Sequence, residues 1–261
     1  MGSKKEWLLQ TFIKTYLHSH VPVGSESLRL VLQDQAVQIS SATIRNYFKR
    51  LTDEGALSQS HSSSGRIPTL EALKAYWRAK LNPHVPFEVD LEKLQNASEH
   101  YQIFSMVERY QRAVLLAVYD HSQRFLILDF GDDQVLLSYN KKLEKFLKGL
   151  VGLECQDIHK IASSVCMASL AKQIEIYFQK RLYFGLCVLA KSLRQSLFLQ
   201  ILKGELLRHL EHGLHFEKVL PLGFLGVLSP AKAQGEDINM FCVGEIEQDF
   251  EGFYGSIRRV S

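Results

Sequence analysis

The apolar side chains near the start of this chain recur at intervals of three and four residues, in three short runs. This spacing is that of an amphipathic helix, so the sequence predicts three short helices that each bury one face. Helices of this length in this order are typical of a helix-turn-helix, in which the third helix enters a DNA groove. The apolar residues are Leu9, Phe12, Ile13, Tyr16 and Leu17 in the first run, Leu28, Val31 and Leu32 in the second, and Ile44, Phe48 and Leu51 in the third.

Residues with strong capping preferences predict where these helices begin and end. Ser25 is expected to cap the second helix, and either Ser40 or Ser41 the third, because a hydroxyl can accept a hydrogen bond from a first-turn amide. Gly55 is placed to end the third helix in a left-handed conformation. Thr69 is expected to cap a fourth helix, which carries Leu70, Leu73, Tyr76 and Trp77.

Between the third and fourth helices lies a polar segment, residues 57–68, which is too short and too hydrophilic to form a core of its own. Its serine and glycine residues favour a hairpin, the wing of a winged helix. The prolines at positions 83 and 86 break the fourth helix and predict a linker at residues 82–90. The sequence therefore predicts a winged helix-turn-helix DNA-binding domain in residues 1–81.

The face of the third helix opposite its apolar residues carries side chains suited to DNA. Arg can form a bidentate pair of hydrogen bonds with guanine, and Asn can do the same with adenine. Lys and hydroxyl groups are suited to contacts with phosphate. An ordinary solvated basic face is the alternative, and the flanking helices and hairpin count against it. The candidate DNA-binding residues are Ser40, Ser41, Ala42, Thr43, Arg45, Asn46, Lys49 and Arg50 on the helix, with His61, Ser62, Ser63, Ser64, Gly65 and Arg66 in the hairpin.

The distribution of charge supports a nucleic-acid partner for this end of the chain. Residues 1–80 hold 11 Lys and Arg against 6 Asp and Glu, whereas the remaining residues hold 20 against 22. The excess of positive charge is therefore confined to the predicted DNA-binding domain, as binding to phosphate requires.

The part of the chain after the linker shows a mixture of helical and strand patterns, which predicts an α+β fold. Three strands separated by short turns are expected to form an antiparallel meander. The predicted elements are a helix over residues 91–109, strands over 113–119, 124–130 and 134–139, mainly helix over 141–216, and strands over 220–228 and 238–244.

Several other functions are disfavoured by composition. The longest apolar run, Leu182–Ala190, has nine residues, too few to span a bilayer, and the N-terminus resembles no signal peptide, so we expect a cytoplasmic protein.

The four cysteines form no closely spaced pair that would suggest zinc. His209, His212 and His215 recur at intervals of three, but no further ligand lies near them, so a solvated face is favoured. We therefore predict no metal and no cofactor.

Four motifs of the N-terminal region together resemble the heat-inducible repressor family HrcA. They are Pro22–Ser25, Ser40–Asn46, Leu51 with Glu54–Leu57, and the segment Ser62–Thr69. The resemblance implies a dimeric repressor of chaperone operons, which binds an inverted-repeat operator in double-stranded DNA and whose activity is aided by a GroEL-type chaperonin.

The resemblance continues more weakly in the rest of the chain. The predicted meander, Leu143–Ile158 and Phe241–Glu247 are similar to segments of the HrcA family. They imply a GAF-like α+β regulatory domain at residues 91–261, into which a helical and β dimerisation element is inserted at about residues 110–200.

Two other functions stay open beside repression of heat-shock genes. An effector-responsive winged-helix regulator of other genes would share the same N-terminal pattern. An enzyme fused to a winged helix is less favoured, since the sequence contains no G-x-G-x-x-G, P-loop or G-x-S-x-G motif, and we predict no enzyme activity. Minor association with a membrane surface is also open, because Leu182–Ala190 and Leu197–Leu202 are apolar.

Overall fold

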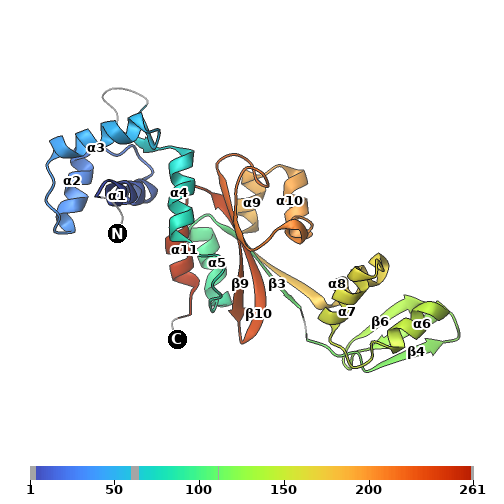
Figure 1. Cartoon of the computed structure of the whole chain (residues 1–261). Helices are drawn as coiled ribbons and strands as arrows, with labels where there is room; N and C mark the ends of the chain where they lie inside the picture. The colour runs from blue at the N-terminus through green and yellow to red at the C-terminus, as the bar shows by residue number, and fades with distance from the viewer. Residues whose placement is uncertain (1–3, 60–64, 111, 260–261) are drawn as a thin grey trace. The chain divides into compact units, whose positions relative to one another are not determined.

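The computed structural model of the chain describes residues 4–59, 65–110 and 112–259 (Figure 1). The chain divides into two compact units. The first, here called the main unit, comprises Met1–Ser105, Tyr183–Gly235 and Met240–Ser261, and the second, the inserted unit, comprises Met106–Leu182 and Glu236–Asn239. The combination of helices and sheets confirms the α+β class, whereas the predicted functional division at residues 82–90 stays a prediction.

The N-terminal part of the main unit contains four helices and a short hairpin. Their cores are the predicted apolar stripes: Phe12 and Phe48 are fully buried and meet edge to face, with ring centroids 5.2 Å apart. The elements are α1 (Lys4–Ser19), α2 (Ser25–Asp34), α3 (Ser41–Asp53), β1 (Leu57–Ser58), β2 (Ile67–Pro68) and α4 (Leu70–Lys80).

The helix ends confirm most of the capping predictions. Ser40 accepts a hydrogen bond from the Thr43 amide and Thr69 accepts one from the Ala72 amide, so each caps its helix. Gly55 has a φ of 75°, the left-handed conformation expected after α3. The prediction for α2 was wrong by one residue. Gly24 is its N-cap and makes no side-chain cap hydrogen bond, because the extended backbone already stops at Gly24 and Ser25 begins the helix.

The chain also forms a five-stranded sheet with helices around it, and the boundary between the main unit and the inserted unit falls within strands β3, β7 and β10 (Figure 1). The five strands run in the order β7-β3-β10-β9-β8, and β8 and β9 pair antiparallel, with Leu214 opposite Val227. The strands are β3 (Phe104–Tyr110), β7 (Gln179–Phe184), β8 (Gly213–His215), β9 (Phe224–Ala233) and β10 (Glu236–Glu245), and the helices are α5 (Leu91–His100), α9 (Leu186–Ser192), α10 (Gln195–Leu202), the 3-10 turn η1 (Leu207–His209) and α11 (Phe250–Ile257).

Helix α4 joins the N-terminal helices to this sheet through a buried tryptophan. The Trp77 side chain is fully buried, and its indole N–H donates a 2.8 Å hydrogen bond to the Ile246 carbonyl. Its ring also meets Phe250 of α11 at a centroid distance of 5.5 Å. One turn earlier, the Lys74 ammonium lies 2.6 Å from a Glu217 carboxylate oxygen. The N-terminal helices therefore share a core with the C-terminal part of the main unit.

The prediction of one helix over residues 91–109 was wrong. The helix ends at His100, and Phe104–Tyr110 forms strand β3 instead. Residues 103–107 are all buried, so they show no alternation that would distinguish a strand from a helix. Residues 141–216 are mainly helical, as predicted, but they also contain strands β7 and β8, which were not predicted, and neither was helix α11.

The inserted unit packs three helices on one face of a three-stranded sheet. The strands follow the predicted meander, with β4 antiparallel to β5 and β5 antiparallel to β6. Its core includes Leu126, Leu128, Val135 and Phe178, which are almost wholly buried. The elements are β4 (Ala117–His121), β5 (Phe125–Asp129), β6 (Gln134–Ser138), α6 (Lys141–Lys148), α7 (Cys155–Ser164) and α8 (Ala168–Phe178).

The described residues contain neither a membrane-spanning helix nor a cluster of metal-binding side chains. Within residues 4–59, 65–110 and 112–259, no helix is both long and apolar enough to cross a membrane. Within the same ranges, no group of three or more His, Cys, Asp or Glu side chains is placed to hold a metal ion, and this includes His209, His212 and His215.

We expect Trp77→Phe to destabilise the protein by about 1–3 kcal/mol, because it leaves the buried Ile246 carbonyl without its hydrogen-bond donor. Urea unfolding followed by far-UV circular dichroism measures the change. Trp7→Phe is the matched control, since Trp7 is only half-buried, and it should cost less. Equal losses in the two variants would show that the hydrogen bond to Ile246 contributes nothing of its own.

Candidate nucleic-acid interface

Helix α3 and its N-cap present seven of the fourteen predicted DNA-binding residues on one exposed face. Ile44, Phe48 and Leu51 are at most 1% exposed and fix the opposite face of the helix to the core. A helix held in this way offers its outer side chains to a partner without first having to order itself. The exposed residues are Ser40, Ala42, Thr43, Arg45, Asn46, Lys49 and Arg50.

The hydroxyl groups at the start of α3 also have structural tasks. The Ser40 hydroxyl accepts a hydrogen bond from the Thr43 amide at 3.2 Å and lies 2.9 Å from the Thr43 hydroxyl. Ser41 is half-buried and donates a hydrogen bond to a Glu26 carboxylate oxygen. The sequence prediction assigned both residues to DNA and left open which of them caps the helix; the structure uses Ser40 as the cap and Ser41 as a link to α2.

Glu26 of α2 is a residue of this surface that the sequence prediction missed. Its carboxylate pairs with Arg29 at 2.6 Å and accepts the Ser41 hydrogen bond. The Arg29 hydrogen bond, followed by that from Ser41, lowers the pKa of Glu26 from its ordinary value to about 2. Glu26 therefore stays ionised and links α2 to the start of α3. A Glu and an Arg three residues apart usually form only a solvated pair, so the sequence carried no clear signal.

Arg66 lies at the base of the hairpin and packs against α3. Its backbone exchanges hydrogen bonds of 2.8 and 3.0 Å with Val23. Its guanidinium lies 5.2 Å from the centre of the Phe48 ring, and its Nε donates to the Thr52 hydroxyl at 3.2 Å. The assignment of Arg66 to DNA stays a prediction, and its guanidinium already has partners within the fold.

Gly65 approaches the turn between α1 and α2 more closely than any other residue type could. A Cβ at this position would lie 2.7 Å from the carbonyl carbon and oxygen of Pro22 and 2.8 Å from the carbonyl carbon of Val23. The hairpin base thus requires glycine for steric reasons. The predicted contacts at His61, Ser62, Ser63 and Ser64 lie outside the described residues.

Comparison with known proteins identifies the family. Residues 77–261 match the family model of the HrcA C-terminal domain. The chain is 38% identical over 260 residues to the heat-inducible transcription repressor HrcA of Helicobacter pylori strain J99, a match that covers 98% of this chain and 95% of the relative. The chain belongs to the HrcA family. The HrcA protein of H. pylori strain 26695 gives 39% identity over 258 residues, with 98% and 94% of the two chains covered.

The HrcA resemblance and the predicted function, a heat-inducible transcription repressor, are therefore confirmed at the level of the family. A crystal structure described only as that of a hypothetical protein has a similar fold. It matches with a TM-score of 0.53 and 19% identity, covering 98% of this chain and 94% of the other.

In this HrcA-family chain, we expect Arg66→Ala to destabilise the fold by about 1–2 kcal/mol. The substitution removes both the contact with the Phe48 ring and the hydrogen bond to Thr52. Arg50→Ala is the control: Arg50 is exposed on α3, the helix against which Arg66 packs, so its loss should change stability by less than about 0.5 kcal/mol. The thermal unfolding midpoints of the two variants are compared with that of the unchanged protein. An unchanged midpoint for Arg66→Ala would contradict the structural role of the Arg66 side chain.

Proposed function

We propose that the protein represses heat-shock genes by binding an inverted-repeat operator in double-stranded DNA as a homodimer, with residues 1–81 as its winged helix-turn-helix domain. The observation that carries this proposal is the exposed face of α3, where Arg45, Asn46, Lys49 and Arg50 project from a helix whose other face is fully buried. Membership of the HrcA family supports the same conclusion.

The residue types on α3 suggest distinct roles. Arg45 and Asn46 are the candidates for bidentate contacts with base edges in the major groove. Lys49 and Arg50 suit phosphates on either side of the groove, and the small side chain of Ala42 allows the helix a close approach. In the hairpin, Gly65 and the residues around it, His61, Ser62, Ser63 and Ser64, would contact the phosphate backbone of the operator.

The outer face of the sheet in the inserted unit is the proposed dimer interface. Tyr119, Ile127 and Leu136 lie opposite one another across the three strands, on the face away from the helices. Tyr119 and Leu136 are 53% and 52% exposed, and Phe125, which lies two residues before Ile127 on β5 and therefore on the same face, extends the apolar surface at 40%. One apolar face of this kind can pair with its own copy about a two-fold axis, and that symmetry matches an inverted repeat.

The remaining parts of the proposal rest on the family resemblance. We assign a GAF-like fold to the sheet and helices of residues 91–261 outside the inserted unit, a GroEL-type chaperonin as a partner, and a cytoplasmic location. The effector-responsive regulator of other genes is the second candidate function, and footprinting on the upstream regions of chaperone operons distinguishes it from the first.

We expect Arg45→Ala and Asn46→Ala each to weaken operator binding by about 1–3 kcal/mol and to relax the preference at particular base pairs. Lys49→Ala should weaken binding to all sequences alike and reduce the salt dependence by about one unit, because it removes one phosphate contact. Fluorescence anisotropy with operator and scrambled DNA at several salt concentrations measures both effects. Lys142→Ala, an exposed charge in the inserted unit, is the control. Unchanged affinity and preference in Arg45→Ala would exclude this face as the recognition surface.

We expect Leu136→Asp to raise the dissociation constant of the dimer at least about 30-fold, because it places a charge in the centre of an apolar interface. Sedimentation velocity over a range of concentrations measures it. Ile176→Asp is the matched variant, since Ile176 is 63% exposed but lies on α8, on the helical side of the same unit. A dimer disrupted only by Ile176→Asp would assign the interface to the helices instead.

A further inference from the structure

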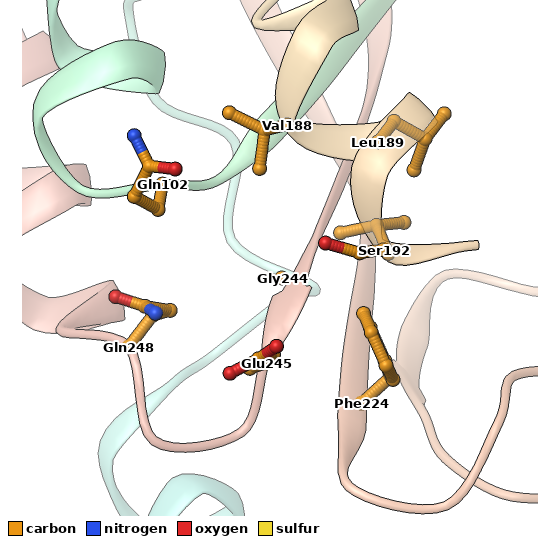
Figure 2. Close-up of a pocket in the computed structure, with 9 residues that line it drawn as sticks. Gln102, Val188, Leu189, Ser192, Phe224, Gly244, Glu245 and Gln248 are labelled. Carbon is orange, nitrogen blue, oxygen red and sulfur yellow. The ribbon is translucent and has the colours of Figure 1, made fainter.

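The main unit contains a small cavity where strand β10 ends, on the side of helix α9 (Figure 2). Its volume is about 90 Å³. For comparison, a cavity of about 150 Å³ is enough to hold benzene, so the occupant here has only a few heavy atoms inside. The lining residues are Gln102, Val188, Leu189, Ser192, Phe224, Val243, Gly244, Glu245 and Gln248.

One part of the cavity wall offers hydrogen-bond acceptors and a negative charge. The Gln102 amide nitrogen donates to the Glu99 carbonyl at 2.6 Å, so its oxygen is the atom left for the cavity. The Glu245 carboxylate and the Ser192 hydroxyl lie around the same space (Figure 2). Among the described residues, neither of these two side chains makes a hydrogen bond or an ion pair. Since no lining residue is Lys, Arg or His, this set of groups favours a cation.

The opposite part of the wall is apolar. Val188 and Leu189 come from α9, and Phe224 begins β9. Leu189 is 2% exposed, and Val188 and Phe224 are half-buried. The surface of an alkyl group packed against these side chains would therefore be removed from water. A bare metal ion would gain nothing from this wall, whereas an organic cation uses both sides of the cavity.

We propose that this cavity binds a small primary ammonium ion, with Glu245 as its counter-ion, and that occupancy is transmitted to helix α4 through residues 245–250. An ammonium group has three N–H donors, and the Gln102 oxygen, the Ser192 hydroxyl and the Glu245 carboxylate supply three acceptors. The Gln102, Ser192 and Glu245 side chains are exposed at the edge of the cavity, so the ammonium group keeps part of its hydration there, and the Glu245 carboxylate supplies the counter-charge.

The path to α4 consists of contacts within the main unit. The residue after Glu245 is Ile246, whose carbonyl accepts the hydrogen bond from Trp77. Glu247 lies beside Tyr16 of α1. The pKa of Tyr16 is raised to about 12, first by burial of the hydroxyl and second by the negative charge of Glu247. Phe250 meets the Trp77 ring. Because α1 and α4 belong to the proposed DNA-binding domain, the effect on operator binding rests on the proposed function.

The cavity is tested by nuclear magnetic resonance on the full-length ¹⁵N-labelled chain. The sequence has two tryptophans, so a Trp7→Phe background leaves the Trp77 indole as the one indole cross-peak. Ethylammonium chloride is titrated at constant ionic strength against potassium chloride. A ligand of three heavy atoms is expected to bind with a dissociation constant on the order of 1 mM or weaker. The Gln102 side-chain amide and the Trp77 indole should shift with one common saturation curve.

Two further variants separate the cavity from general charge effects. Glu245→Gln should weaken ethylammonium binding at least tenfold, whereas Glu205→Gln, which removes an exposed carboxylate elsewhere in the main unit, should leave it unchanged. Potassium chloride should produce no saturable shift. Equal shifts in potassium, or an unchanged curve in Glu245→Gln, would overturn the ammonium site. Saturable shifts at Gln102 without any at Trp77 would overturn the coupling.

A separate measurement distinguishes failure of the cavity from failure of the proposed function. Operator affinity of the Trp7→Phe chain is measured by anisotropy with and without saturating ethylammonium, at constant ionic strength. A change that Glu245→Gln removes supports the coupling to DNA, and no change overturns it. A chain that binds no operator under either condition refutes the proposed function, while the resonance shifts still decide whether the cavity binds ammonium.

Discussion

The hydrogen bond from the Trp77 indole to the Ile246 carbonyl is the interaction on which the organisation of the main unit depends. It joins residues 169 positions apart and is wholly buried, where a hydrogen bond is strong and an unmade one is costly. Around it, Phe250 meets the Trp77 ring and Lys74 pairs with Glu217. The match to the HrcA C-terminal domain also begins at residue 77. Helix α4 is therefore both the last helix of the proposed DNA-binding domain and part of the core that follows it.

The position of α3 depends on contacts at both ends of the helix. At its start, Ser41 donates to Glu26, which Arg29 keeps ionised. Near its middle and end, Arg66 covers the Phe48 ring and donates to Thr52. With α3 held by these contacts, Arg45 and its exposed neighbours lie on the surface of the protein. A recognition helix fixed in this way gives up little conformational freedom on binding DNA, which supports affinity without additional contacts.

The features that the sequence predicted correctly are those set by neighbouring residues. The caps at Ser40 and Thr69, the left-handed Gly55 and the meander of the inserted unit all follow from patterns a few residues long. Strand β3 was missed because a run of buried residues fits a helix equally well, and its neighbours in the sheet, β7 and β10, come from distant parts of the chain. At the candidate site, the exposed face of α3 was predictable from helical periodicity. The packing of Arg66 on Phe48 was not, since it depends on how the hairpin returns to the helix.

The segment 245–250 connects the main features of the main unit within six residues. Its first residue lines the cavity, its second accepts the Trp77 hydrogen bond, and its last packs against the Trp77 ring. The Ile246 amide donates to the Gly223 carbonyl at 2.8 Å, and the Phe250 amide donates to the Gln248 carbonyl at 3.0 Å. A loose loop would absorb a displacement of Glu245, but this segment is held at Ile246 by Gly223 and Trp77 and at Phe250 by the Trp77 ring, so a displacement passes to these neighbours. A ligand at Glu245 can shift the equilibrium of the DNA-binding helices only by its difference in affinity for two arrangements of this segment. The buried Trp77 indole requires an acceptor in both arrangements, so both would keep this hydrogen bond and would differ in its geometry at the Ile246 carbonyl.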